Sequence, residues 1–108
     1  MPRRAPSHLS PATRRWWVKT AEQWQLEEHH LKLLTLAGEA YDRGREARAV
    51  VEREGSYFVD RFKQPRAHPA LAVERDSRLS FARLLRELDL DVDPPAAPSR
   101  PAQLRRYA

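Results

Sequence analysis

The 108-residue chain contains no cysteine and only three glycines. Without cysteine it has no disulfide framework, no thiol nucleophile and no thiolate ligand for zinc. The few glycines form neither a Gly-x-x-x-x-Gly-Lys-Ser/Thr phosphate-binding loop nor a Gly-x-Ser-x-Gly nucleophile elbow. We therefore predict a protein that is not an enzyme, with no catalytic residue and no cofactor.

Long hydrophobic runs are also missing. A helix that crosses a bilayer needs roughly 20 apolar residues, whereas the apolar runs here are only a few residues long. The first residues contain no hydrophobic signal core. We expect a cytosolic protein without a membrane partner.

Strong core-forming side chains are scarce, because the chain has 13 Leu, 6 Val and 3 Phe but no Ile. A domain of this size buries only about 60 to 70% of the surface of its unfolded chain. Association with further copies would hide more apolar surface. The sequence therefore predicts a single small domain with a thin core that forms a homo-oligomer.

Positive charge is in excess and is unevenly distributed. Lys and Arg number 20 against 15 Asp and Glu, and 17 of the cations are Arg. Residues 1–25 hold five cations and one acid, and residues 94–108 hold three cations and no acid. Basic ends around a nearly neutral body are typical of nucleic-acid contact, although solvated tails have the same composition. We favour contact with nucleic acid.

The first predicted helix begins at Pro11. Ser10 supplies a capping hydroxyl, and proline is well tolerated at the first helical position, so we expect a helix from there to about Trp24. Trp17 and Trp24 fall on one face of this helix. Both are predicted core residues.

A second, much longer helix is predicted to begin near Glu27. Leu26 and Leu31 bracket that start as a hydrophobic staple, and no proline interrupts the chain before Gly55. The helix would therefore span about 27 residues, or on the order of 40 Å. It is the central element of the predicted fold.

Small side chains repeat along one face of this central helix at alternating steps of four and three. We call this set the small-residue stripe: Leu33, Ala37, Ala40, Gly44, Ala47 and Val51. Small residues let two helices approach closely, within one chain or between chains. We predict that the stripe forms the oligomer interface.

A short β-hairpin is predicted over residues 56–65, where aromatic and β-branched residues alternate around Asp60 and Arg61. An isolated two-stranded hairpin is marginal unless it packs against something else. We expect Phe58 and Phe62 to pack it against the helices. Pairing of its exposed edge between subunits is the alternative.

A third helix is predicted to begin at His68-Pro69 and to end near Leu88. Its predicted buried side consists of Ala72, Leu79, Ala82, Leu84, Leu85 and Leu88. The expected fold is thus mainly α: a helical hairpin with a long central helix, a short β-hairpin and a third helix, assembling into a ring-like homo-oligomer. Its parts are a basic arm (1–9), a helical oligomerisation and DNA-binding core (10–93) and a flexible proline-rich basic tail (94–108).

The candidate DNA-binding residues lie near the N-terminus. They are Arg3, Arg4, Arg14, Arg15, Lys19 and Trp16. The cations suit the phosphate backbone. The indole of Trp16 either stacks on a base or sugar or packs against a neighbouring subunit.

The dense group Glu27-Glu28-His29-His30 invites comparison with a metal site. Adjacent histidines point about 100° apart on a helix, whereas a zinc-binding pair is spaced near i, i+4. We therefore predict no metal site and assign the group to helix capping.

The order of short motifs resembles the small terminase subunits of tailed phages with long non-contractile tails, over about residues 8 to 93. The first half of the match consists of His8-Leu9-Ser10, Arg15-Trp16-Trp17, Leu26 to Leu31 and Ala40-Tyr41-Asp42-Arg43. The second half consists of Gly55-Ser56-Tyr57, Asp60-Arg61-Phe62, His68-Pro69-Ala70, Glu74-Arg75-Asp76 and Leu84 to Leu88. The chain departs from the family in lacking glycine in the hairpin turn.

The resemblance implies a non-enzymatic subunit that forms a ring, binds double-stranded viral DNA where packaging begins, and recruits and regulates the large ATPase and nuclease subunit. It places the protein in the cytoplasm of the host bacterium. The basic tip of the tail is our candidate for binding the large subunit, through Arg105, Arg106 and Tyr107.

Two other classes remain open at this point. A stand-alone DNA-binding transcriptional regulator would use the same charges with a helix in the major groove, and would bind a palindrome as a dimer. A structural or protein-binding module would have no affinity for DNA.

Overall fold

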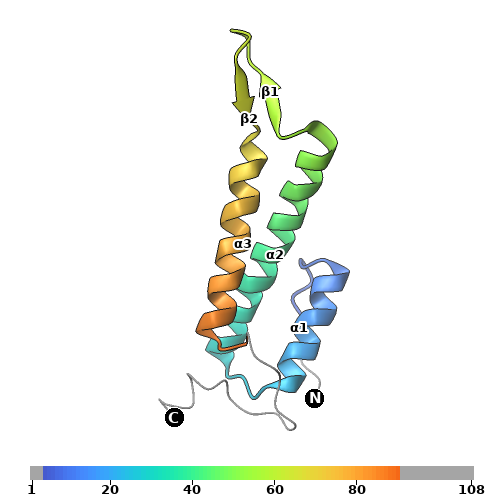
Figure 1. The fold of residues 1–108 in the computed structure, drawn as a ribbon. Helices are drawn as coiled ribbons and strands as arrows, with labels where there is room; N and C mark the ends of the chain where they lie inside the picture. Colours follow the sequence, from blue (N-terminus) through green and yellow to red (C-terminus); the bar gives the residue numbers. More distant parts are fainter. Residues whose placement is uncertain (1–3, 91–108) are drawn as a thin grey trace.

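The computed structural model describes residues 4–90 and shows a mainly helical chain with one two-stranded antiparallel sheet (Figure 1). The elements are α1 (Pro11–Gln23), α2 (Glu28–Glu54), β1 (Tyr57–Val59), β2 (Pro65–Ala67) and α3 (Pro69–Glu87). The three helices and the hairpin confirm the mainly α class. Arg3, the tail 94–108 and its residues Arg105, Arg106 and Tyr107 lie outside the described residues.

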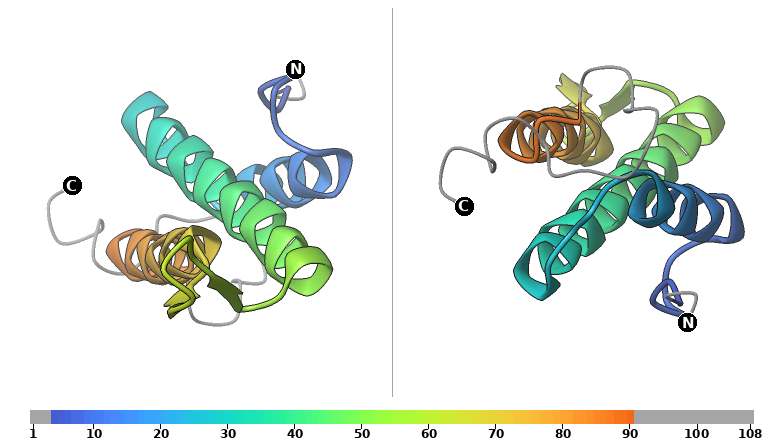
Figure 2. Two further views of the ribbon diagram at one scale, coloured as in Figure 1. Left: turned by 90° about the horizontal axis from the view of Figure 1, so that it is seen from above. Right: turned by 90° about the horizontal axis from the view of Figure 1, so that it is seen from below.

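Helices α2 and α3 run side by side in opposite directions, and the β-hairpin joins them at one end (Figure 1). Helix α1 packs on α2, and Figure 2 shows α2 lying between α1 and α3. The molecule is elongated, with extents of 58 × 27 × 21 Å. No helix within residues 4–90 has both the length and the apolar character to span a membrane.

The predicted helix starts are confirmed by their capping contacts. At α1, the Ser10 Oγ accepts a hydrogen bond from the backbone N–H of Thr13 at 3.3 Å. At α2, the backbone N–H of Glu27 donates to Nδ1 of His30 at 3.0 Å, which is one arm of a capping box. These local contacts explain why each helix begins where the sequence predicts.

The end of α2 and the start of α3 are also defined by short-range contacts. Gly55 follows α2 with a φ of 89°, in the region that favours glycine. His68 caps α3 by accepting from the backbone N–H of Ala70 at 3.0 Å, while its other ring nitrogen lies 3.2 Å from a Glu54 carboxylate oxygen. His68 thereby links the two long helices across the base of the hairpin.

The hydrophobic core lies at the end of the helical pair away from the β-hairpin. Its buried cluster contains Leu9, Trp17, Trp24, Leu26, Leu34 and Leu88. Leu31 packs against this cluster, in keeping with the predicted staple at the start of α2. The assignment of both tryptophans to the core is confirmed.

The small-residue stripe packs within the chain. Ala37, Ala40, Ala47 and Val51 are buried in the single chain, and a Cβ built on Gly44 would lie 3.3 Å from Cβ of Ser77 on α3. Only Leu33 and Gly44 keep partial exposure. Because α3 and α1 already cover this face, the expectation that the buried members form an oligomer interface is wrong.

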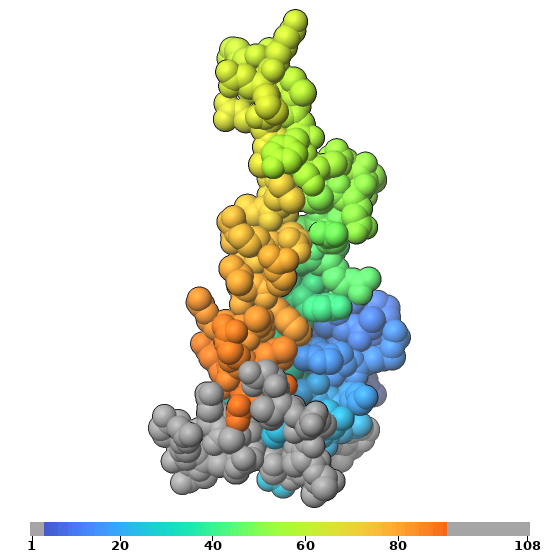
Figure 3. Space-filling model, in the orientation of Figure 1, coloured from blue at the N-terminus to red at the C-terminus, as the bar shows by residue number. Residues whose placement is uncertain are grey.

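The predicted β-hairpin exists, but its second strand and its packing differ from expectation. β2 begins only at Pro65, because residues 60–64 form a longer turn with Lys63 at a φ of 60°. Phe62 is 67% exposed, and Phe58 is 44% exposed with its ring 6.5 Å from that of His68 at the start of α3. The two phenylalanines therefore give the hairpin little packing against the helices. The hairpin instead extends beyond them (Figure 3).

The buried side of α3 also differs from the prediction. Leu79 is 57% exposed and Ala72 is exposed, whereas Ser77 is buried against α2. The close approach of α3 to Gly44 leaves no room for a larger side chain at Ser77. Leu88 is buried and Ala82, Leu84 and Leu85 are half-buried, so apolar periodicity placed the second half of this face correctly and its first half incorrectly.

Candidate nucleic-acid interface

Four of the predicted DNA-binding cations line one shallow groove along α1. They are Arg4, Arg14, Arg15 and Lys19, and the remaining lining residues are Ala5, Pro11, Val18 and Glu22. The groove has a volume of about 590 Å³ and is widely open to solvent. Glu22 is the single acid in its lining. Such an open, cationic surface matches a polyanionic backbone better than a small ligand.

The groove cations have no carboxylate partner, whereas five of the other ten arginines in residues 4–90 form an ion pair. Within residues 4–90, no ion pair or side-chain hydrogen bond involves Arg4, Arg14, Arg15 or Lys19. By contrast, Arg48 pairs with Glu52 at 3.1 Å. The groove charges are therefore available to an external anion.

Asp42 on α2 fixes the first turn of α1, which carries this groove. Its Oδ1 accepts from the hydroxyls of Thr13 at 2.6 Å and Ser10 at 2.9 Å, and its Oδ2 accepts from the backbone N–H of Ser10 at 2.8 Å. Burial alone would raise the pKa of Asp42, but the hydrogen bonds from Thr13 and Ser10 outweigh it and the pKa lies below its ordinary value. A charged Asp42 thus holds α1 in place.

Two further contacts set the distance between α1 and α2. The indole Nε1 of buried Trp17 donates to Oγ1 of Thr35 at 3.2 Å. A Cβ built on Gly38 would lie 3.1 Å from Cγ2 of Thr13 and 3.2 Å from Cδ1 of Leu9. The missing side chain at Gly38 therefore permits the close approach that presents the groove at this position.

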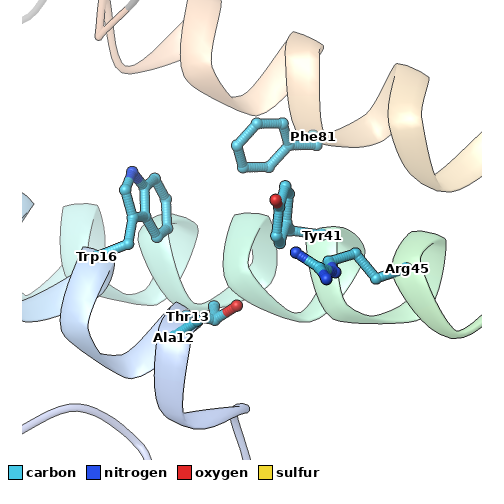
Figure 4. Close-up of a pocket in the computed structure, with 6 residues that line it drawn as sticks. All are labelled: Ala12, Thr13, Trp16, Tyr41, Arg45 and Phe81. Carbon is cyan, nitrogen blue, oxygen red and sulfur yellow. The ribbon is translucent and has the colours of Figure 1, made fainter.

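Trp16 does not belong to the cationic groove. Its ring lies 5.8 Å from that of Phe81 on α3, and Tyr41 lies 5.3 Å from Phe81 on the other side. These three rings and Arg45 line a separate pocket of about 240 Å³ between the helices (Figure 4). Trp16 thus packs within its own chain, and no base-stacking role follows from its position.

The histidines at the start of α2 have a structural role. His30 is buried and completes the cap described above, and its pKa is lowered by burial and by the neighbouring His29. No group of three or more potential metal ligands occurs in the part of the chain that the structure describes. The capping assignment of this segment is confirmed.

Sequence reasoning found the groove cations but missed the residues that position them. The sequence assigns no role to Thr13 or to Asp42, although Asp42 lies in the Ala40-Tyr41-Asp42-Arg43 motif. A lone acid on a helix has no partner visible in the sequence, because Asp42 and Ser10 are 32 positions apart. No sequence signal identified the aromatic pocket either.

No protein-family model, no curated protein and no solved structure matches the chain. The described fold therefore defines the class only as a three-helix protein with a β-hairpin and a cationic groove on its first helix.

Proposed function

We propose that the protein is the small subunit of a viral DNA-packaging terminase, a non-catalytic adaptor that works as a homo-oligomer. It would bind double-stranded viral DNA at the start of packaging and recruit and regulate the large ATPase and nuclease subunit in the host cytoplasm. The order of motifs in the sequence supports the family assignment, and the cationic groove supports the DNA-binding part.

The groove is the observation that carries this proposal. Its four unpaired cations provide phosphate contacts that carry no sequence information of their own. A single copy would bind DNA weakly under physiological salt. In a ring of copies, the same groove is repeated, so that many weak contacts act together. Such binding suits an adaptor that must hold DNA without cutting it.

The test is the salt dependence of DNA binding by the full-length chain. We expect the double substitution Arg15→Gln/Lys19→Gln to lower affinity for a labelled duplex on the order of tenfold at low salt. Each lost phosphate contact should reduce the slope of log affinity against log salt by about 0.9, so by about 1.8 for two. Fluorescence anisotropy over a salt series measures both quantities.

Arg83→Gln/Arg86→Gln is the matched control, because it removes the same charge from exposed positions of α3 outside the groove. Equal losses in the two double variants would show that only net charge matters and would contradict the proposed interface. A preference for one DNA sequence of about 10³-fold or more would instead favour the transcriptional regulator.

A further inference from the structure

The β-hairpin gathers much of the exposed apolar surface of the described chain. Tyr57, Val59 and Phe62 are 69%, 67% and 67% exposed, the highest values among the large hydrophobic side chains of residues 4–90. The hairpin stands beyond the ends of α2 and α3 (Figures 1 and 3). A two-stranded hairpin that does not pack against other elements is only marginally stable in water. Its apolar surface needs a partner.

One face of the hairpin carries no charge. The register pairs Tyr57 with Ala67 and Val59 with Pro65, so these four residues share one face. All four are exposed. The opposite face carries the pair Phe58 and Arg66. The uncharged face is suited to another apolar surface and not to phosphate.

The outer edge of β1 has free backbone groups. The Ser56 carbonyl accepts from His68 N at 2.7 Å, and Asp60 N donates to the Gln64 carbonyl at 3.0 Å. Hydrogen-bonded and non-hydrogen-bonded pairs alternate in an antiparallel ladder. The backbone N–H and C=O groups of Phe58 are therefore hydrogen-bonded to β2, whereas those of Tyr57 and Val59 point outward.

The two edges of the hairpin are not equivalent. On β1, both outward-facing residues, Tyr57 and Val59, offer a donor and an acceptor, and no partner is found for them within residues 4–90. On β2, one of the two outward-facing residues is Pro65, which has no N–H. Proline at an edge weakens further strand pairing. β1 is therefore the open edge.

We propose that β1 pairs with β1 of a second copy of this chain, antiparallel and about a twofold axis through Phe58. The two hairpins then form one four-stranded sheet. In this register Tyr57 lies opposite the partner's Val59, an aromatic and β-branched pair that stabilises antiparallel sheets. The outward N–H and C=O groups of both residues are satisfied on each strand.

The second copy fits this surface for two reasons. An uncharged face packs beside an identical face without any charge conflict, and a twofold contact requires a surface to be complementary to itself. The pairing also joins the two apolar faces into one continuous surface, since opposite residues in antiparallel strands point to the same side. An acidic or nucleic-acid partner would find no charge on this face.

This contact goes beyond the proposed function and is independent of the cationic groove. A twofold contact joins copies in pairs, so a ring needs a separate head-to-tail surface. A chain that pairs through β1 but does not bind DNA would contradict the proposed function alone. A chain that binds DNA through the groove but does not pair through β1 would contradict this inference alone.

Cysteine crosslinking of the full chain tests the register directly, because the protein has no cysteine of its own. The twofold axis places Phe58 opposite the partner's Phe58 in a non-hydrogen-bonded pair, with Cα atoms about 4.5 Å apart, within disulfide range. We expect Phe58→Cys to form a covalent dimer under mild oxidation.

Arg66→Cys is the matched control for that crosslink. Arg66 lies on the same face as Phe58 but on β2, so its two copies would be three strand spacings apart, about 14 Å. It should form little covalent dimer. Equal crosslinking of the two variants overturns the proposal. Crosslinking that requires a mixture of both variants also overturns it, in favour of head-to-tail pairing of β1 with β2.

A second pair of variants tests the open edge of β1 without introducing a cysteine. Val59→Pro removes an outward N–H of β1, and Ala67→Pro removes an outward N–H of β2, while both leave the ladder within the hairpin intact. Sedimentation velocity should show at least a tenfold weaker dimer for Val59→Pro and little change for Ala67→Pro. A Val59→Pro chain that dimerises as the unsubstituted protein does would overturn the proposal.

Discussion

At the scale of single residues, Asp42 joins α2 to the start of α1 through three side-chain hydrogen bonds. One carboxylate accepts three hydrogen bonds from Ser10 and Thr13 across 29 and 32 positions of sequence. Hydrogen bonds to a charged acceptor are stronger than those between neutral groups. The position of α1, and so of the cationic groove, depends on this side chain.

We therefore expect Asp42→Asn to lower the free energy of unfolding by roughly 1 to 3 kcal/mol at neutral pH. The amide replaces one acceptor oxygen with a donor that faces the donors of Ser10. Urea unfolding monitored by tryptophan fluorescence measures the loss. Asp76→Asn, on the exposed face of α3, is the control and should change stability by less than about 0.5 kcal/mol.

Asp42 also predicts a pH dependence. Its pKa in the folded protein lies below the ordinary value of 3.8, so the charged carboxylate stabilises the fold above that pH. The stabilisation is lost as the pH falls from 3.8 through the lower pKa of the folded state. The difference in unfolding free energy between the protein and Asp42→Asn should thus shrink on acidification. A difference that stays constant to the lowest measurable pH would contradict this assignment.

At the scale of elements, the turn of the β-hairpin is organised by Asp60. Its Oδ1 accepts from the backbone N–H groups of Phe62 at 2.8 Å and Gln64 at 3.0 Å, and its Oδ2 pairs with Arg66 at 3.0 Å. These hydrogen bonds keep the pKa of Asp60 below its ordinary value, and the bond from the backbone N–H of Gln64 has the largest effect. The turn thus forms without glycine, although Lys63 adopts a positive φ.

We expect Asp60→Ala to remove the amide hydrogen-exchange protection of the turn while the helices keep theirs. The reason is that the hairpin lies outside the hydrophobic core and contributes little to it. Far-UV circular dichroism should show unchanged helical content. Arg61→Ala leaves the backbone bonds of Asp60 in place and should preserve the protection. A loss of helix in Asp60→Ala would contradict the independence of the hairpin.

At the scale of the whole molecule, the small-residue stripe decides how α2 and α3 approach each other. Ala47 is 5% exposed in a single chain, and Gly44 lies close to Ser77. These small side chains therefore let α2 and α3 lie close together in this part of the helical pair. The large side chains of the core lie around α1 and at the ends of α2 and α3 away from the β-hairpin.

Ala47→Leu should destabilise the fold by about 1 to 3 kcal/mol, because the added volume has no space between α2 and α3. The loss should not depend on protein concentration, since the contact lies within one chain. Thermal unfolding at several concentrations measures both properties. Ala49→Leu, at an exposed position of the same helix, is the control and should be nearly neutral. A loss of stability that grows on dilution would contradict this prediction and would indicate that the stripe forms an interface between copies.

The sequence by itself determined where the helices begin and end. Ser10, Glu27, Gly55 and His68 act within a few residues of the chain, so their capping roles are encoded locally and are visible without a fold. The clustering of cations near the N-terminus is likewise a local property. For these reasons, the helix boundaries and most of the cationic groove could be predicted.

Only the tertiary structure decided which faces are covered. The small-residue stripe could have served a contact within or between chains, and the position of Ser77 against Gly44 shows that it is used within one. The anchor at Asp42 and the packing of Trp16 on Phe81 likewise join residues far apart in sequence. Apolar periodicity identifies which face of a helix is apolar but not which element or chain covers it. The covering element depends on how the elements pack in the folded protein.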